Sequence, residues 1–273
     1  VWLELKLGSN NIVPGYAAYA FANQADVLVN TRHAADAAGA TKMDRPEWTA
    51  VNPKNGDVYL TLTNNSARAL ASTDAANPRY YNDPKGAAKT AQRGNPNGHV
   101  VRFADANRDP AATSFTWDVY LFGSRATMSA DINASGLTED NDFSSPDGMW
   151  FSQAAAGLLW LQTDDGKFTD VTNCMMLAAL PGQVGDGGKR TLTNIGSDGV
   201  STKTQDTVVG AQATGTTLRR FLVGPVACEI HGLDETRDGQ ASVVNIQHPG
   251  EDGQPATDPA NFDSHGPDGA TSR

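Results

Sequence analysis

The chain has 273 residues, a formal net charge of −10, a pI of about 4.8 and 39% hydrophobic residues. This length and apolar content suit one large all-β domain, or two smaller domains, with a real core. The acidic balance argues against binding to a nucleic-acid backbone, and no apolar run approaches the roughly 20 residues that span a bilayer.

The N-terminal stretch contains one strand-like and one helical pattern. Residues 1–7 alternate between apolar and polar side chains, which is typical of a strand. Residues 31–39 are rich in alanine and close with a glycine at the position of a C-cap, so a short helix is expected there. Because the strand pattern already begins at Val1, we expect a processed or incomplete polypeptide.

Residues 43–48 read Met-Asp-Arg-Pro-Glu-Trp and carry residue types suited to chemistry. Arg45 offers a planar, permanently charged guanidinium that can bind a phosphate or a carboxylate. Glu47 follows two residues later, and alternate side chains of a strand share one face. Pro46 favours an extended backbone at Arg45, so the two side chains are expected to project side by side. Taken alone, the stretch would also fit a surface ion pair.

From residue 48 onward the sequence has the pattern of short strands separated by turns. Apolar and β-branched residues alternate between turn residues such as Gly, Asn, Asp and Pro. The expected strands cover residues 48–51, 58–63, 99–103, 115–122, 149–152, 158–163 and 242–246. Residues 66–97 predict a long irregular loop, and residues 252–273 predict a poorly ordered tail.

Three of the strand pairs begin with a similar corner. Pro46-Glu47, Pro146-Asp147 and Glu229 each open a strand, a turn and a second strand. Recurring strand pairs without helices are typical of a β-propeller, whereas a β-sandwich gives no reason for an acid to recur at the corner. We therefore predict an all-β fold, a partial β-propeller of several blades over residues 1–251, with a short helical insertion and long loops.

The recurring acids predict a metal site. The innermost strands of propeller blades line one channel, so Glu47, Asp147 and Glu229 would crowd negative charge unless a cation lay between them. Carboxylates, and an amide oxygen such as that of Asn141, suit hard cations, with Ca²⁺ first. Each acid could instead cap a turn or face solvent. His248 follows an apolar strand and is expected at the same end of the channel.

The remaining candidates show no ligand spacing. The other histidines are interpreted as incidental, and Asp164-Asp165 as turn chemistry; these histidines are His33, His99, His231 and His265. The two cysteines, Cys174 and Cys228, form no metal-binding motif, and buried free thiols are expected rather than a bridge.

Four segments, in this order, resemble the PhoX-type alkaline phosphatases. They are Lys-Met-Asp-Arg-Pro-Glu at 42–47, Phe-Ser-Ser-Pro-Asp-Gly at 143–148, Phe-Leu-Val-Gly-Pro at 221–225 with Glu229, and Val-Asn-Ile-Gln-His-Pro-Gly-Glu at 244–251. The resemblance implies an exported, periplasmic or secreted β-propeller enzyme that hydrolyses phosphomonoesters with Ca²⁺ and Fe³⁺ on its axis. It also implies that Arg45 binds the substrate phosphate, that Glu47, Asp147 and Glu229 are metal ligands, and that Asn141 or Asp142 is a further one.

The resemblance extends to the C-terminal half of that family's chain. An N-terminal companion segment is therefore expected to complete the propeller and its site. The family's export signal, and the thiolate and carboxylate ligands of its first half, have no match here. Neither Cys174 nor Cys228 occupies the position of that thiolate.

The sequence thus predicts a metal-dependent phosphomonoesterase in which Arg45 and Glu47 act in catalysis and Arg45 and His248 contact the substrate. Two alternatives stay open. A calcium-binding propeller lactonase or esterase would hold a single ion with Asn141, Asp147 and Glu229, and would need no arginine for phosphate. A non-enzymatic, calcium-stabilised scaffold would lose stability on chelation without any loss of activity.

Overall fold

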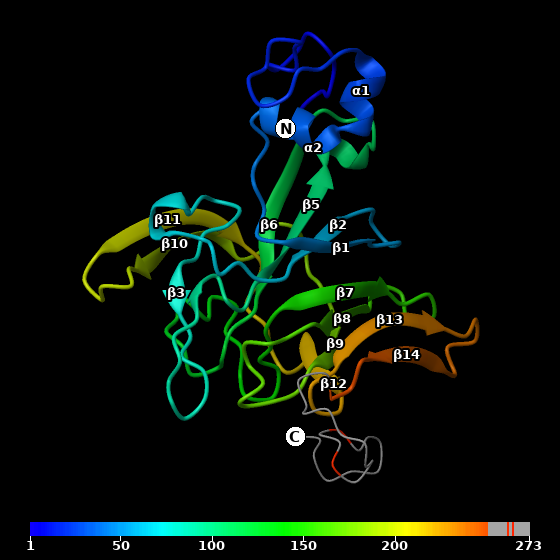
Figure 1. Cartoon of the computed structure of the whole chain (residues 1–273). Helices are drawn as coiled ribbons and strands as arrows, with labels where there is room; N and C mark the ends of the chain where they lie inside the picture. The colour runs from blue at the N-terminus through cyan, green and yellow to red at the C-terminus, as the bar shows by residue number, and fades with distance from the viewer. Residues whose placement is uncertain (251–260, 262–263, 265–273) are drawn as a thin grey trace. The chain divides into compact units, whose positions relative to one another are not determined.

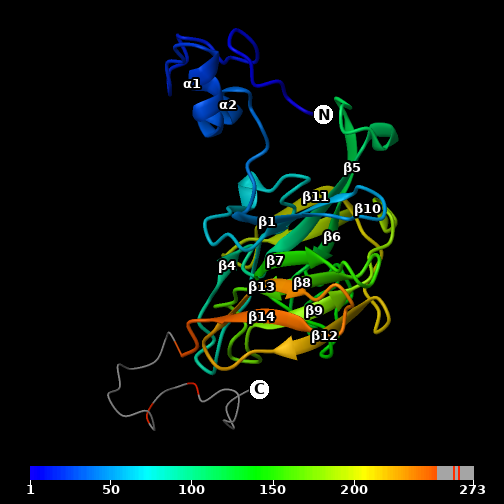
Figure 2. The ribbon, with the colours of Figure 1, turned by 90° about the vertical axis from the view of Figure 1, so that its right-hand side faces the viewer.

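The computed structural model describes residues 1–250, 261 and 264, and these residues are mostly β-sheet (Figure 1 and Figure 2). This confirms the predicted all-β class. The chain divides into two compact units, the first comprising Val1–Lys42 with Asp105–Phe115 and the second comprising the rest. In the described part of the chain, no helix has the length and apolar character needed to cross a membrane.

The first unit contains both α-helices and one short 3-10 helix. α1 covers Gln24–Val29, α2 covers Thr31–Ala37, and the short 3-10 helix η2 covers Ala106–Arg108. α2 confirms the helix predicted from the alanine-rich stretch, and Gly39 takes a left-handed φ of +72° just beyond its end. The core of this unit consists of Ile12, Phe21, Val27, Ala34 and Ala37.

The prediction of a strand at residues 1–7 is wrong, because these residues form no strand. The backbone N–H of Trp2 donates to the carbonyl of Thr113, and the Trp2 ring packs on Phe115 at a centroid distance of 4.7 Å. A strand needs a continuous ladder of such bonds to a neighbour. Alternation of apolar and polar residues predicts which face of a strand each side chain would take. It does not show that a neighbouring strand is available for pairing.

The second unit is built from one six-stranded sheet, one four-stranded sheet and two sheets of two strands each. The six-stranded sheet has the order β1-β2-β5-β6-β11-β10, and its β6–β11 pair is parallel. Its strands are β1 (Pro46–Val51), β2 (Val58–Leu62), β5 (His99–Asp105), β6 (Phe115–Phe122), β10 (Gly188–Ile195) and β11 (Thr202–Val209). The last residue of β5, Asp105, and the first residue of β6, Phe115, belong to the first unit.

The other sheets complete the second unit. The four-stranded sheet, in the order β12-β9-β8-β7, consists of β7 (Pro146–Phe151), β8 (Leu159–Thr163), β9 (Met175–Ala179) and β12 (Leu218–Val223). One of the two-stranded sheets consists of β13 (Glu229–Glu235) and β14 (Ser242–Gln247). The predicted long loop at 66–97 holds only short elements, which are η1 (Leu70–Ser72), β3 (Tyr81–Asn82) and β4 (Arg93–Gly94).

Apolar side chains fill the spaces between successive sheets. Tyr59 of the six-stranded sheet packs edge to face on Phe151 of the four-stranded sheet, at a centroid distance of 5.2 Å. On the other side of the four-stranded sheet, Trp160 and Met176 belong to one buried cluster with Ile230 of β13. Burial of each such side chain contributes about 1.5–3 kcal/mol. This packing sets the edge strand β7 beside both β1 and β13 (Figure 1).

Both cysteines lie in the second of these clusters and are free, as expected from the sequence. Burial raises the pKa of Cys228 to about 11 and also raises the pKa of Cys174. Since the thiolate is the reactive form, both thiols act as apolar packing groups at neutral pH.

Residues 1–250 form stacked sheets and do not show a closed propeller. Glu251 and nearly all of the predicted tail at 252–273 lie outside the described residues.

Candidate functional site

The corner at Arg45 differs from its prediction in backbone and agrees with it in side-chain placement. Arg45 has a left-handed φ of +50°, not the extended backbone expected before a proline. Its carbonyl accepts a hydrogen bond of 3.0 Å from the N–H of Thr63, which holds this conformation. β1 then begins at Pro46, and the Nη2 of Arg45 lies 3.4 Å from the Oε1 of Glu47. The two side chains therefore do lie side by side.

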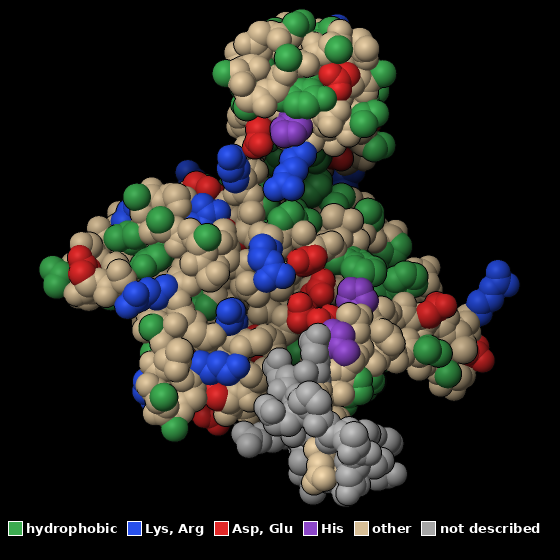
Figure 3. Space-filling view, in the orientation of Figure 1, with side chains coloured by type: hydrophobic (Ala, Val, Ile, Leu, Met, Phe, Trp, Pro, Cys, Tyr) green, Lys and Arg blue, Asp and Glu red, His purple; other side chains and the backbone are tan. Residues whose placement is uncertain are grey.

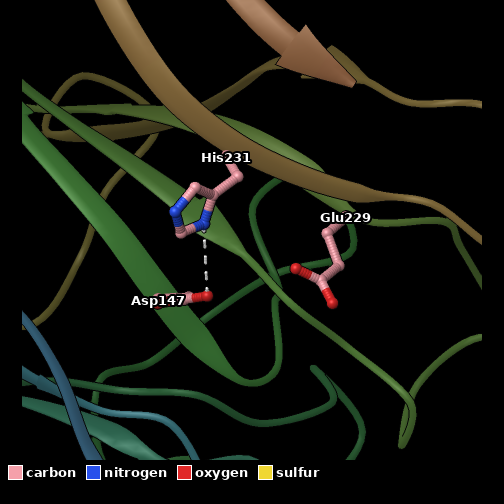
Figure 4. Close-up of side chains that lie close together, drawn as sticks. All are labelled: Asp147, Glu229 and His231. Atoms are coloured by element: carbon pink, nitrogen blue, oxygen red, sulfur yellow. Dashed lines mark ion pairs between the residues drawn. The ribbon is translucent and has the colours of Figure 1, made fainter. Parts of the chain in front are cut away.

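A second group of side chains comes from β7 and β13. Asp147 lies on β7, and Glu229 and His231 are alternate residues of β13, so both project from the same face of that strand. The candidate ligand atoms of the three residues all lie within 4.8 Å of one another. The Nδ1 of His231 is 3.6 Å from the Oδ2 of Asp147, with Glu229 beside them (Figure 4).

The electrostatics of Asp147 show how crowded this place is with negative charge. Burial raises the pKa of Asp147, His231 opposes that change, and the like charges of Glu47 and Asp164 raise it further. Glu47 of the Arg45 corner is therefore close enough to influence the buried carboxylate. The arrangement favours a cation between these acids.

His248 lies beside the third acid. It follows β14 with a left-handed φ of +32°, and its Nε2 is 3.0 Å from the Oε1 of Glu229. Burial raises the pKa of Glu229, the charge of Asp164 adds to this, and His248 opposes it. Acidic and histidine side chains adjoin one another on one face of the second unit (Figure 3). A role for His248 in substrate binding stays a prediction.

Asn141 is placed elsewhere. Its Oδ1 accepts a bond of 2.8 Å from the N–H of Thr138, and its Nδ2 donates to the carbonyl of Leu218 at 3.2 Å. Leu218 begins β12, which is the edge strand opposite β7 in the four-stranded sheet. The amide of Asn141 thus holds a turn to the far edge of the sheet, and we do not include it in the site.

Two residues that the sequence analysis set aside belong to this group. His231 was interpreted as incidental and Asp164 as part of a turn. The two-residue spacing of Glu229 and His231 is the signal used for Arg45 and Glu47, and it would have identified His231. Asp164 directly follows β8 and donates its N–H to the carbonyl of Ser145, which brings it to the start of β7. Only the strand pairing reveals that placement.

Comparisons with known proteins give two matches. The family model for alkaline phosphatase PhoX matches residues 1–250. The solved structure of Pseudomonas fluorescens PhoX in complex with vanadate, a transition state analogue, is 32% identical in sequence and superposes with a TM-score of 0.66. The match covers 97% of this chain and 39% of that chain. No curated protein matches this sequence.

Proposed function

Since this chain belongs to the PhoX family of alkaline phosphatases, we propose that it forms part of a metal-dependent site that hydrolyses phosphomonoesters and releases inorganic phosphate. The proposal is carried by one observation, the half-exposed guanidinium of Arg45 beside a compact group of carboxylates and an imidazole. Phosphoryl transfer needs such an arrangement, because its catalysis rests on positioning and on stabilising the charge of the phosphoryl oxygens.

Arg45 would bind the phosphoryl oxygens through its planar set of N–H donors. Its present partner Glu47 is 3.4 Å away, and both side chains are well exposed to solvent. An exposed ion pair of this kind contributes at most about 1 kcal/mol. A dianionic phosphate could therefore replace Glu47 at the guanidinium and leave the carboxylate of Glu47 available to a cation.

Asp147, Glu229 and His231 would hold metal, with Glu47 as a further ligand. The fit is supported by the Nδ1 of His231, which is buried and makes no hydrogen bond within the described residues. Carboxylate oxygens suit Ca²⁺, whereas an imidazole nitrogen suits a transition metal such as iron, so the set is compatible with both ions of the proposal. Bound cations would supply positive charge that polarises the phosphoryl oxygens.

The PhoX chain of known structure is longer than this chain. The chain spans 39% of the PhoX chain that it matches, so we propose that an N-terminal companion segment supplies further sheets and ligands. The stack in which β7 lies beside β1 and β13 supports blades of a β-propeller with the site at its axis. Family membership supports a periplasmic or secreted location.

The test is hydrolysis of a chromogenic phosphomonoester at alkaline pH, with and without a calcium chelator. Activity that is lost on chelation and returns with Ca²⁺ supports the proposal. Hydrolysis of a lactone or a carboxylic ester that survives Arg45→Ala would favour the lactonase or esterase alternative, which needs no phosphate-binding arginine. Absence of activity in buffer with Ca²⁺, together with a melting temperature that falls on chelation, would favour a scaffold.

A further inference from the structure

A buried asparagine joins the Arg45 corner to the corner that begins β7. Asn64 follows β2 and is 7% exposed. Its Oδ1 accepts a hydrogen bond of 3.0 Å from the Nη1 of Arg45, and its Nδ2 donates to the Oγ of Ser145 at 3.2 Å. We propose that Asn64 is a positioning residue, which fixes the guanidinium of Arg45 for an incoming phosphoryl group. The proposal rests on the function proposed above.

Arg45 needs such a partner because little else restrains it. Its side chain is 53% exposed, and its contact with Glu47 is a long, solvent-screened pair. A free arginine side chain has many rotamers, and ordering one costs about 2 kcal/mol. The partly buried hydrogen bond to Asn64 offsets part of that cost before any ligand binds. Arg45 is thereby preorganised.

The amide of Asn64 is itself held in one orientation. The Oγ of Ser145 lies 3.2 Å from the Oδ1 of Asp165, a buried carboxylate that also accepts backbone N–H bonds from Lys167 and Phe168. With its hydrogen given to Asp165, Ser145 accepts from the Nδ2 of Asn64. The Oδ1 of Asn64 must then face Arg45. The polar chain from Asp165 to Arg45 consequently determines where the guanidinium points.

The choice of an amide has a chemical reason. A carboxylate in this place would also accept from Arg45, but it would neutralise the charge that attracts phosphate. Asn64 orients the cation and leaves its charge intact. It occupies one of the five N–H donors of the guanidinium, so donors remain for phosphoryl oxygens.

The experiment is a double-mutant cycle on the full chain with its bound metal, with inorganic phosphate and orthovanadate as probes. Asn64→Ala should weaken binding of both probes by about tenfold, because the freed Arg45 must be ordered on binding. In the Arg45→Ala background, Asn64→Ala should cause no further loss. KM for a chromogenic phosphomonoester should rise with the same dependence on Arg45. A merely structural asparagine would weaken binding by the same factor in both backgrounds.

A control and a second variant keep the test decisive. Asn194→Ala removes another buried amide, one that bonds the backbone of Tyr80 and Pro78, and it should leave the affinity for both probes unchanged. If Asn64→Ala does not fold, Ser145→Ala frees the amide of Asn64 and should weaken binding by about threefold, again only when Arg45 is present.

The outcomes separate the two proposals. If Arg45→Ala weakens binding and neither Asn64→Ala nor Ser145→Ala does, the positioning role is wrong and the proposed function stands. If Arg45→Ala itself leaves phosphate and vanadate binding unchanged, the phosphate-binding role fails, and the positioning role fails with it.

Discussion

The corners at Arg45 and Ser145 have nearly the same backbone. φ is +50° at Arg45 and +52° at Ser145, and each residue is followed by a proline and then by an acid. The carbonyl of each accepts a hydrogen bond from the end of the neighbouring strand, at 3.0 Å from Thr63 and at 3.1 Å from Asp164. Both strand pairs also shift register directly after the proline.

The surroundings of the two corners are opposite. The side chains of Arg45 and Glu47 are 53% and 38% exposed, whereas Ser145 is fully buried and the side chain of Asp147 is 9% exposed. A solvated corner can exchange its ion pair for a soluble anion, while a buried acid surrounded by like charges would be stabilised by a bound cation. The repeated backbone therefore decides where each carboxylate lies, and burial decides what it can bind.

Asp147→Asn should have the largest effect, because it changes the buried corner. In chelator the variant should be slightly more stable than the wild type, since it removes a buried charge that Glu47 and Asp164 repel. With metal at about 100 times its Kd, the wild type gains about 2.7 kcal/mol and the variant should lose most of this gain. Phosphatase activity should fall by more than about a hundredfold.

Thermal unfolding in chelator measures the expected gain in stability of Asp147→Asn. Thermal unfolding in excess Ca²⁺ measures the expected loss of stabilisation by metal. Asp140→Asn makes the same charge change at an exposed position and serves as the control. A variant that is destabilised in chelator, yet gains as much from Ca²⁺ as the wild type, would contradict a metal-binding role for Asp147.

Arg45 variants address the exposed corner. Arg45→Ala should lower kcat/KM for phosphomonoesters by about 10² to 10³, the cost of removing one charge-stabilising donor group. Arg45→Lys should recover about a tenth of the wild-type value, because it keeps the charge and loses the planar fork. Steady-state kinetics checks this, with the exposed Arg219→Ala as a control. Equal activity of the Lys and Ala variants would show that charge at this corner is unimportant.

The hydrogen bonds next to the two corners also differ. Those next to Arg45 involve a histidine, so the stability of the protein should depend on pH there. Asp44 is buried and bonds the Nδ2 of Asn95, which in turn donates to the Nδ1 of His99. The Nε2 of His99 lies 2.8 Å from the carbonyl of Ala76, so the imidazole is held neutral with its hydrogen on Nε2. Burial lowers the pKa of His99 to about 4.

The sign of the resulting pH dependence follows from linkage. An unfolded histidine titrates near 6.5, so between about pH 6.5 and 4 the unfolded chain takes up a proton that folded His99 excludes. Stability due to His99 is complete above this window and should fall by about 2 kcal/mol between pH 7.5 and pH 5. His99→Gln should remove that part of the slope in urea unfolding, and the exposed His33→Gln is the control. An unchanged slope would show that His99 has the same pKa in the folded protein as in the unfolded chain.

Much of the fold was predictable because strand signals are local. Alternation and turn residues located β1, β2, β7, β8 and β14, and the recurrence of an acid after the corner placed Glu47, Asp147 and Glu229 at the starts of their strands. The left-handed backbone at Arg45 was not predictable, because the steric rule for a residue before proline points the other way and the bond from Thr63 outweighs it.

Contacts between strands that are distant in sequence could not be predicted either. His231 meets Asp147 only because β13 packs beside β7, and Asn64 meets Ser145 only because β2 ends near the start of β7. Asn141 lies apart from this group for a local reason. Its Oδ1 serves a turn three residues away, a local use of asparagine that competes with any distant ligand.

Glycine substitutions at the corners should have the smallest effect on stability. They measure what the left-handed backbone conformation shared by the corners costs. Ala227, two residues before Glu229, has φ +50°, so all three acids follow a left-handed residue. Ala227→Gly relieves that conformation and should stabilise the protein by about 0.5–1 kcal/mol, or about 1–3 °C in Tm.

Ser145→Gly relieves the same φ but deletes the hydroxyl bonded to Asn64 and Asp165, and should destabilise the protein. Ala178→Gly in β9, where φ is not positive, should also destabilise. Ala227 has the same left-handed φ as Ser145, but its side chain has no polar group to form a hydrogen bond. A gain in stability at residue 227 with a loss at residue 145 would therefore show that the backbone conformation is strained and that side-chain hydrogen bonds compensate for the strain at Ser145.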